Sequence, residues 1–221
     1  MAILQLYNAS KSFGNKEVLN KVHFTCETGE VLGIFGRNGS GKSTLLKMIF
    51  GVVPSNNIKM TIDNTLLNPL EVIADKRIAY LPQVPFLPKN RKVHDIIPIY
   101  FSSEEKQDSV FYDPVIAKIS SRRVGELSMG ELKYFEVVLI GNLDHDFLLL
   151  DEPFSMVEPI EKEALKNFLL QKKETKGLII TDHYYYDVMD ISTKNIIIKD
   201  RVSHEVHGEE DLKKFKYLSE R

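Results

Sequence analysis

Apolar and polar residues follow two different periods along this chain, and these periods predict where strands and helices lie. From Ile3 to about Phe35 they alternate around turns that contain Gly14 and Gly29, a pattern typical of antiparallel strands. The end of this segment, residues 31–35, is apolar apart from one glycine and predicts a buried strand. Residues 58–62 alternate again, so we expect a further strand there.

The carboxyl-terminal half of the chain alternates between apolar runs and helical patterns. In residues 131–142 the side chains of Leu132, Phe135, Val138 and Leu139 fall on one face of a helix. The predicted elements are strands over residues 147–150, 177–180 and 195–199, and helices over 131–142, from Pro159 onward and over 211–218. Alternating strands and helices predict an α/β fold with a mainly parallel sheet.

The stretch between these two regions has a different character. It carries Pro85, Pro88, Pro98 and Pro114, with helical patches such as residues 93–97 between them. We therefore expect residues 1–221 to form one domain, into which residues 84–135 insert a compact helical subdomain.

A glycine-rich segment follows the buried strand at residues 31–35 and precedes an apolar helix at 45–50. It fits the pattern G-x-x-x-x-G-K-[ST] of a phosphate-binding P-loop, in which backbone N–H groups surround a phosphate. The predicted ATP-binding residues of this P-loop are Gly36, Arg37, Asn38, Gly39, Ser40, Gly41, Lys42, Ser43 and Thr44. Lys42 is expected to reach the β- and γ-phosphates, and the Ser43 hydroxyl suits Mg²⁺.

The apolar strand at residues 147–150 leads into two acids, Asp151 and Glu152. Ligands bind beyond the carboxyl ends of strands in an open α/β sheet, so both carboxylates are expected near the P-loop. Asp151 is the predicted Mg²⁺ partner. Glu152 is the predicted residue that orients or deprotonates an attacking water.

Several further short motifs resemble those of the ATP-binding cassette (ABC) ATPases, in matching order and spacing over nearly the whole chain. Residues 127–131, which include Ser128, Met129, Gly130 and Glu131, resemble the signature motif LSGGQ. Gln83 resembles the Q-loop glutamine, and residues 181–183, which end in His183, resemble the H-loop. Residues 155–158 resemble the D-loop, and Phe13 resembles the aromatic residue that stacks on adenine.

Three positions depart from the family pattern. Met129 stands where the family usually has glycine, and Glu131 stands where it often has glutamine. The D-loop ends in Glu158, which is one methylene longer than the usual aspartate. Ser128 and Gly130, the γ-phosphate contacts that the resemblance implies, are retained.

The resemblance implies an ATPase that binds ATP and Mg²⁺ and acts as a head-to-tail dimer, in which the P-loop of one copy faces the signature of the other. It implies that Glu152 activates water, that His183 contacts the γ-phosphate, and that Gln83 senses Mg²⁺. The expected partners are transmembrane subunits on separate chains, which ATP-driven dimerisation would energise. A soluble, non-transport ABC ATPase that acts on a macromolecular complex is the alternative. A small P-loop kinase is disfavoured by the signature and by residues 181–183.

Composition narrows the setting of this ATPase. The formal net charge of −2 gives no basic surface for nucleic acid, so no nucleic-acid partner is expected. Cys26 is the only cysteine, which is typical of a reducing compartment. No signal peptide is evident, and no apolar run approaches the roughly 20 residues of a membrane span. The expected location is the cytoplasm, peripheral on the cytoplasmic face of the membrane.

Overall fold

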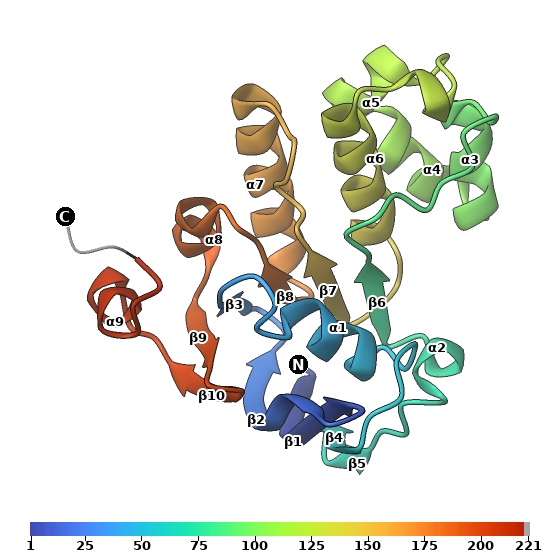
Figure 1. Cartoon of the computed structure of the whole chain (residues 1–221). Helices are drawn as coiled ribbons and strands as arrows, with labels where there is room; N and C mark the ends of the chain where they lie inside the picture. Colours follow the sequence, from blue (N-terminus) through green and yellow to red (C-terminus); the bar gives the residue numbers. More distant parts are fainter. Residues whose placement is uncertain (219–221) are drawn as a thin grey trace.

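Two sheets and the helices between and above them make up the computed structural model, which describes residues 1–218 (Figure 1). The strands are β1 (Ile3–Phe13), β2 (Lys16–Glu27), β3 (Val31–Phe35), β4 (Asn57–Ile62), β5 (Thr65–Leu66), β6 (Ile78–Leu81), β7 (Phe147–Asp151), β8 (Gly177–Thr181), β9 (Lys194–Lys199) and β10 (Val202–Glu205). The helices are α1 (Lys42–Ile49), α2 (Val72–Asp75), α3 (Val93–Tyr100), α4 (Glu104–Phe111), α5 (Pro114–Ile119), the 3₁₀ helix η1 (Val124–Glu126), α6 (Met129–Gly141), α7 (Pro159–Lys173), α8 (Tyr185–Ile191) and α9 (Glu209–Lys214).

The first sheet is antiparallel, with the strand order β2-β1-β4-β5. The second has the order β10-β9-β3-β8-β7-β6, and all its pairs are parallel except β10 with β9. The predicted α/β fold with a mainly parallel sheet and an antiparallel β part is therefore confirmed. In Figure 1 helix α1 lies between the two sheets, while α6, α7 and α8 cover the other side of the parallel sheet.

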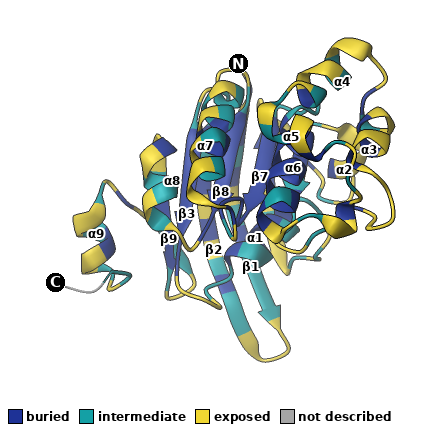
Figure 2. Cartoon of the chain, turned by 90° about the horizontal axis from the view of Figure 1, so that it is seen from above, coloured by how far each residue is buried: buried dark blue, intermediate teal, exposed yellow. Residues whose placement is uncertain are grey.

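The parallel sheet is buried on both faces, as the continuous apolar strands predict. Because side chains alternate along a strand, each strand contributes to two cores. Leu32 and Ile34 of β3 pack with α1 and the antiparallel sheet, whereas Val31 and Phe35 pack with α6, α7 and α8. Figure 2 shows these central strands buried and the outer faces of the helices exposed.

The parallel register brings the carboxyl ends of β3, β6, β7 and β8 to one edge of the sheet. Ile34 of β3 pairs with Thr181 of β8, Asp151 of β7 pairs with Thr181, and Leu81 of β6 pairs with Leu150. The segments that leave these ends are the P-loop, Gln83, Glu152 and the H-loop. Four separated sequence motifs therefore converge at this edge.

Two predicted helices have different limits in the structure. Helix α6 begins at Met129 rather than at residue 131, because Ser128 and Glu131 form a capping box that draws the preceding residues into the first turn. Helix α9 spans residues 209–214 rather than 211–218. Lys216 adopts a left-handed conformation (φ 55°) and the Tyr217 N–H turns back to the Leu212 carbonyl, which ends the helix.

Helices α3, α4, α5, η1 and α6 follow one another between residues 93 and 141, in the region where a helical subdomain is expected. Helix α6 runs on beyond residue 135 and packs against β6 and β7. The limits 84–135 for this subdomain stay a prediction. Within residues 1–218, no helix has the length and apolar character needed to cross a membrane.

Candidate nucleotide-binding site

The P-loop joins β3 to α1 and encloses the Lys42 side chain. Gly36, Gly39 and Gly41 have φ angles of 151°, 80° and 102°, which residues with a Cβ rarely adopt. The Lys42 ammonium donates a hydrogen bond of 2.6 Å to the Gly36 carbonyl oxygen, and the residue is only 7% exposed. Burial lowers the pKa of Lys42 below its ordinary value, although the carboxylates of Glu152, Asp151 and Asp182 oppose this shift.

The loop fits an anionic ligand. The Ser40 Oγ atom is buried and has no hydrogen-bond partner within residues 1–218. A Cβ at Gly36 would lie 2.4 Å from this oxygen and 2.9 Å from the Ile198 carbonyl, so the backbone passes too closely for any side chain. Lys42 and the amino end of α1 supply positive charge to the same loop. These features suit a nucleotide phosphate.

Asp151 lies at the end of β7 and is fully buried. Its Oδ1 atom accepts hydrogen bonds from the Ser43 hydroxyl at 2.9 Å and from the Thr181 hydroxyl at 2.8 Å. Its Oδ2 atom accepts a hydrogen bond from the Tyr80 hydroxyl at 3.2 Å. The Ser43 hydroxyl and the Asp151 carboxylate lie side by side and present hard oxygen donors, and this donor set fits Mg²⁺.

Glu152 is held on both carboxylate oxygens. Its Oε1 atom lies 2.8 Å from His183 Nε2. Its Oε2 atom accepts hydrogen bonds from Gln83 Nε2 at 2.9 Å and from the Ser155 hydroxyl at 3.2 Å. The residue adopts a left-handed backbone (φ 58°), while its N–H donates to the Thr181 carbonyl at 2.7 Å. Such strain in a residue with a side chain persists only where the surroundings enforce it, and it is frequent at functional sites.

Asp182 connects the segment that follows Glu152 with the segment that follows β8. It is fully buried, and its carboxylate accepts hydrogen bonds from the N–H groups of Phe154 at 2.8 Å and Tyr184 at 3.0 Å. Burial raises the pKa of Asp182 above its ordinary value, although these backbone N–H groups oppose the shift. The residue that precedes the D-loop and the H-loop of the same chain are thus joined through one carboxylate.

The contacts of Tyr80, Thr181 and Ser155 with the two acids were not predicted from the sequence. Thr181 lies in the H-loop motif, Ser155 lies in the D-loop motif, and Tyr80 lies on the strand that ends before Gln83. The parallel pairing of β6, β7 and β8 brings Tyr80 and Thr181 beside the acids, whereas Ser155 follows Glu152 by three residues in the chain. The one available signal was a hydroxyl side chain near the end of each neighbouring strand.

The signature residues lie at the start of α6. Ser128 caps the helix, and its hydroxyl accepts from the Glu131 N–H at 3.1 Å while Glu131 Oε2 accepts from the Ser128 N–H at 2.7 Å. Arg122 also donates to Glu131, at 2.7 Å. Burial would raise the pKa of Glu131, but the Ser128 N–H and Arg122 outweigh it and lower the value. A carboxylate at residue 131 therefore fits its surroundings in this chain.

Two predicted groups of residues stay apart from the rest. Among residues 1–218, no hydrogen bond or salt bridge joins Ser128, Met129, Gly130 or Glu131 to the P-loop. Phe13 lies at the end of β1, is 53% exposed, and has the Lys11 ammonium 4.7 Å from its ring centre. One chain therefore brings together the P-loop, both acids, Gln83 and His183, while the signature lies elsewhere on the same chain.

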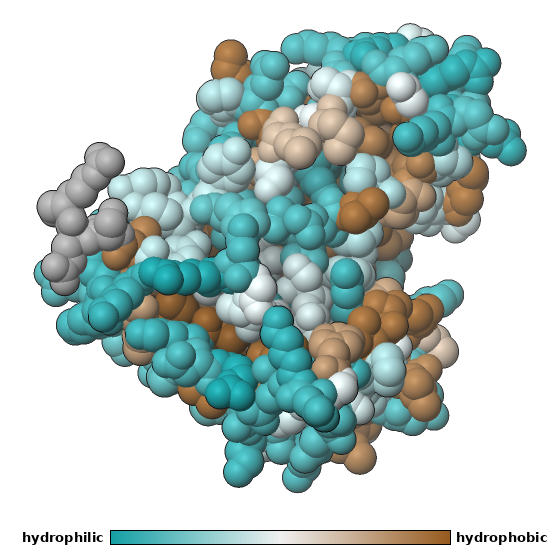
Figure 3. Space-filling model, in the orientation of Figure 1, coloured by the Kyte–Doolittle hydropathy of each residue, from teal (hydrophilic) through white to brown (hydrophobic). Residues whose placement is uncertain are grey.

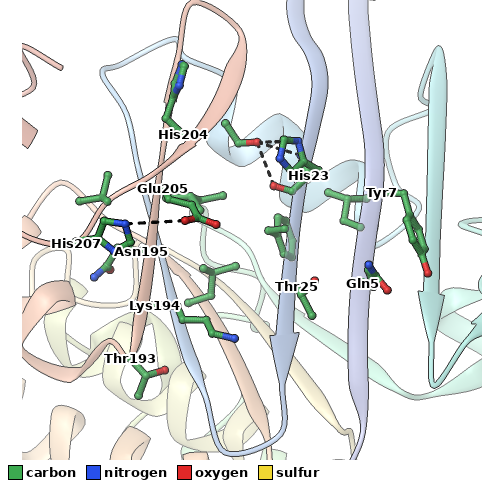
Figure 4. Close-up of a pocket in the computed structure, with 16 residues that line it drawn as sticks. Gln5, Tyr7, His23, Thr25, Thr193, Lys194, Asn195, His204, Glu205 and His207 are labelled. Atoms are coloured by element: carbon green, nitrogen blue, oxygen red, sulfur yellow. Dashed lines mark hydrogen bonds and ion pairs between the residues drawn. The ribbon is translucent and has the colours of Figure 1, made fainter. Parts of the chain in front are cut away.

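A separate cleft of about 600 Å³ lies between the antiparallel sheet and the β9–β10 hairpin (Figure 4). His23, His204 and His207 line it, and the Ser203 hydroxyl contacts the His23 ring. No group of three or more metal-ligating side chains within the described residues could hold a metal ion. None of the nucleotide-site residues lines this cleft.

The fold and the site together define a P-loop ATPase with an ABC-type signature helix. The sequence profile described as "ABC transporter" matches residues 19–155, and the chain belongs to that family. It is an ATP-binding subunit and an ATPase that energises transport.

Similar proteins include an ATP-binding protein of the lipopolysaccharide export system of Haemophilus influenzae, which is 29% identical over 90% of this chain and 87% of its own length. A zinc import ATP-binding protein of Ehrlichia ruminantium is 29% identical over 98% of this chain and 88% of its own length.

Two solved structures share the fold. One is an ATP-binding subunit of an ABC transporter, with a TM-score of 0.83 and 20% identity over 99% of this chain and 95% of the other. The second is a nucleotide-free cassette from an ABC transporter, with a TM-score of 0.81 and 23% identity over 99% and 96% of the two chains.

Proposed function

We propose that this chain hydrolyses ATP with Glu152 as the general base, on a nucleotide held by the P-loop and Phe13. The observation that carries the proposal is the position of the Glu152 carboxylate, with His183 at 2.8 Å on one oxygen and Gln83 at 2.9 Å on the other. A carboxylate fixed in this way is oriented to accept the proton of an attacking water. His183 and Gln83 are then the groups beside the γ-phosphate.

Mg²⁺ is proposed to bind at Ser43 and Asp151, with Gln83 near it. When bound, the ion offsets the charge of the phosphates and orients them. Thr181 and Tyr80, which donate to the same carboxylate, hold Asp151 in place for this role.

A second copy of the chain is the proposed partner that completes the site. Within the part that the structure describes, no hydrogen bond joins Ser128 or Gly130 to the P-loop of the same chain, and Ser128 is exposed. A head-to-tail dimer would bring the signature of one copy to the nucleotide of the other. The anionic nucleotide then satisfies donors on both copies, and its hydrolysis weakens the dimer.

Transmembrane subunits are the proposed membrane partners, and the chain would bind them peripherally on the cytoplasmic face. Figure 3 shows apolar side chains exposed where α2 and α3 lie. Leu70 and Ile73 near α2 are 85% and 59% exposed, Ile99 of α3 is 70% exposed, and Val84 beside Gln83 is 71% exposed. Such a surface supports docking of an apolar partner. The relatives named above serve export and import, so the direction of transport is not part of the proposal. What is proposed is that ATP binding and hydrolysis by this chain supply the energy for transport.

The Glu152→Gln variant tests the hydrolytic role. The amide keeps the shape of the side chain but cannot take up the proton of a water molecule. Loss of a general base costs about 10²- to 10⁴-fold in rate, so turnover should fall by that factor while MgATP affinity stays unchanged. Light scattering should then detect an ATP-dependent dimer of the variant. A variant with near-normal turnover would show that Glu152 is not the base.

A further inference from the structure

Two charged side chains of α6 are buried in a place where the nucleotide site does not use them. Glu136 is 0% exposed and Lys133 is 4% exposed. They are three residues apart on the helix and therefore share one face. The segment that leaves β6 runs beside this helix (Figure 1).

The hydrogen bonds of both side chains go to this segment. The Lys133 ammonium donates to the carbonyl oxygens of Pro82 at 3.2 Å and Gln83 at 3.1 Å. Glu136 Oε1 accepts from the Phe86 N–H at 2.9 Å. The backbone of residues 82–86, which we name the Q-loop segment, is therefore fixed to the signature helix at both of its ends.

We propose that Lys133 and Glu136 are positioning residues, which hold the Q-loop segment on the signature helix and so keep the Gln83 side chain at Glu152. The Gln83 carbonyl is bonded to Lys133, and the Gln83 amide is bonded to Glu152 Oε2. A displacement of α6 is thereby passed to the catalytic carboxylate through one residue. The catalytic part of this inference rests on the proposed role of Glu152.

The energetic cost of these two charges argues against a role in stability alone. Glu136 Oε2 is buried and has no hydrogen-bond partner within residues 1–218, and no salt bridge joins it to Lys133. Burial raises the pKa of Glu136 and lowers the pKa of Lys133, so each charged form is disfavoured where it lies. Apolar residues of similar size in such places are often neutral or stabilising. What the two charged side chains provide, and apolar side chains would not, is the set of hydrogen bonds that holds the Q-loop backbone in place.

The chain has no tryptophan, so Phe86→Trp introduces a single tryptophan into the Q-loop segment, and its fluorescence can be excited separately from that of the tyrosines. The substitution retains the N–H that Glu136 accepts, and Phe86 is already 38% exposed. All variants are made in this background. Acrylamide quenching and anisotropy decay report the mobility of the segment, and steady-state kinetics report turnover.

Lys133→Met removes the ammonium that makes both hydrogen bonds and leaves an unbranched apolar side chain one heavy atom shorter. We expect quenching to rise about twofold and kcat to fall about tenfold or more, since small displacements of catalytic groups have effects of this size. KM and MgATP affinity should stay within about twofold, because the P-loop is untouched. Lys133→Arg, which keeps donors, should restore most of the turnover. Lys133→Gln, whose amide is too short to reach both carbonyls, serves as the second variant if Lys133→Met does not fold.

Lys176→Met is the matched control. Lys176 also donates to two backbone carbonyls, those of Leu143 at 2.6 Å and His145 at 2.7 Å, away from the nucleotide site. It should change neither quenching nor kcat. Unchanged quenching in the Lys133 variants overturns the proposal, and so does increased quenching with normal kcat. Failure of the general-base proposal is seen separately, as turnover in Glu152→Gln.

Discussion

Gly130→Ala should displace the D-loop of the same chain. Gly130 is the second residue of α6 and is buried against residues 156 and 157. An added Cβ would lie 2.6 Å from the Met156 carbonyl oxygen and 3.3 Å from the Val157 Cα. Both contacts are backbone atoms, so no side-chain rotation can relieve them. Met156 already adopts a left-handed conformation (φ 64°), which leaves its loop little freedom.

The size of the effect follows from this contact. Because real Cβ contacts are essentially never shorter than 3.0 Å, the D-loop must move by at least about 0.4 Å. Overpacking of this kind costs about 1–3 kcal/mol. Alanine returns about 1 kcal/mol through its higher helix propensity. The net loss of about 0–2 kcal/mol predicts a Tm lower by up to about 8 °C for a chain of this size.

Gly130→Ala should also lower kcat, and this effect should be easier to detect than the change in Tm. The Ser155 hydroxyl, in the displaced loop, donates to Glu152 Oε2 at 3.2 Å. A misplacement of about 1 Å in a catalytic site can cost 10²-fold, so a shift of several tenths of an ångström is expected to lower kcat by about 10-fold. MgATP affinity of the isolated chain should not change.

ATPase kinetics, calorimetry with MgATP and thermal unfolding measure these three quantities. Gly208→Ala is the control: it also adds a Cβ to a glycine, but no atom beyond its chain neighbours lies within 4 Å of that position. Should Gly130→Ala keep wild-type kcat and Tm, the contact with Met156 does not constrain the loop and the reasoning is wrong.

Three further predictions concern other parts of the molecule. Phe13→Ala should weaken ATP binding by about 5- to 150-fold in calorimetry, as expected for the loss of a stacked base at about 1–3 kcal/mol, with little change in Tm; normal affinity with a collapsed Tm would assign Phe13 to the core. Mixing Ser128→Arg with Lys42→Ala should restore part of the ATPase activity that each variant lacks, because a mixed head-to-tail dimer has one intact site; full activity of Ser128→Arg alone contradicts a composite site. The Tm of Glu136→Gln relative to wild type should rise with increasing pH. Burial raises the folded-state pKa of Glu136, so the stability that this residue contributes is present below its ordinary pKa of 4.5 and is lost as pH rises through the folded-state pKa. A Tm difference between the variant and wild type that stays constant from pH 4 to pH 8 contradicts this.

The sequence by itself predicted most of the elements and the residues of the proposed nucleotide site. The spacing of Gly36, Gly41 and Lys42 defines a P-loop because only glycine tolerates the backbone angles that such a loop requires. Apolar runs predicted strands β3, β7 and β8 because a parallel sheet is buried on both faces. Local patterns set these features, and they can be recognised within about ten residues of chain.

The limits of the helices depend partly on local sequence and partly on tertiary structure. Ser128 and Glu131 form a capping box that a short pattern encodes, yet the apolar periodicity predicted a helix that begins at residue 131. The end of α9 depended on a left-handed turn at Lys216, a residue type that gives no signal for it. Helix limits are therefore predicted less well than helices themselves.

Only the tertiary structure decided which side chains surround the two acids and the Q-loop segment. The Ser43 and Asp151 side chains that meet at 2.9 Å are 108 residues apart in the chain, and Lys133 lies 50 residues beyond the Gln83 carbonyl that it contacts. Lys133 and Glu136 are charged residues within an apolar helix, and sequence alone gives no reason to bury them. Their burial follows from the packing of α6 against β6, because the backbone of residues 82–86 leaves the sheet there and its polar groups require partners.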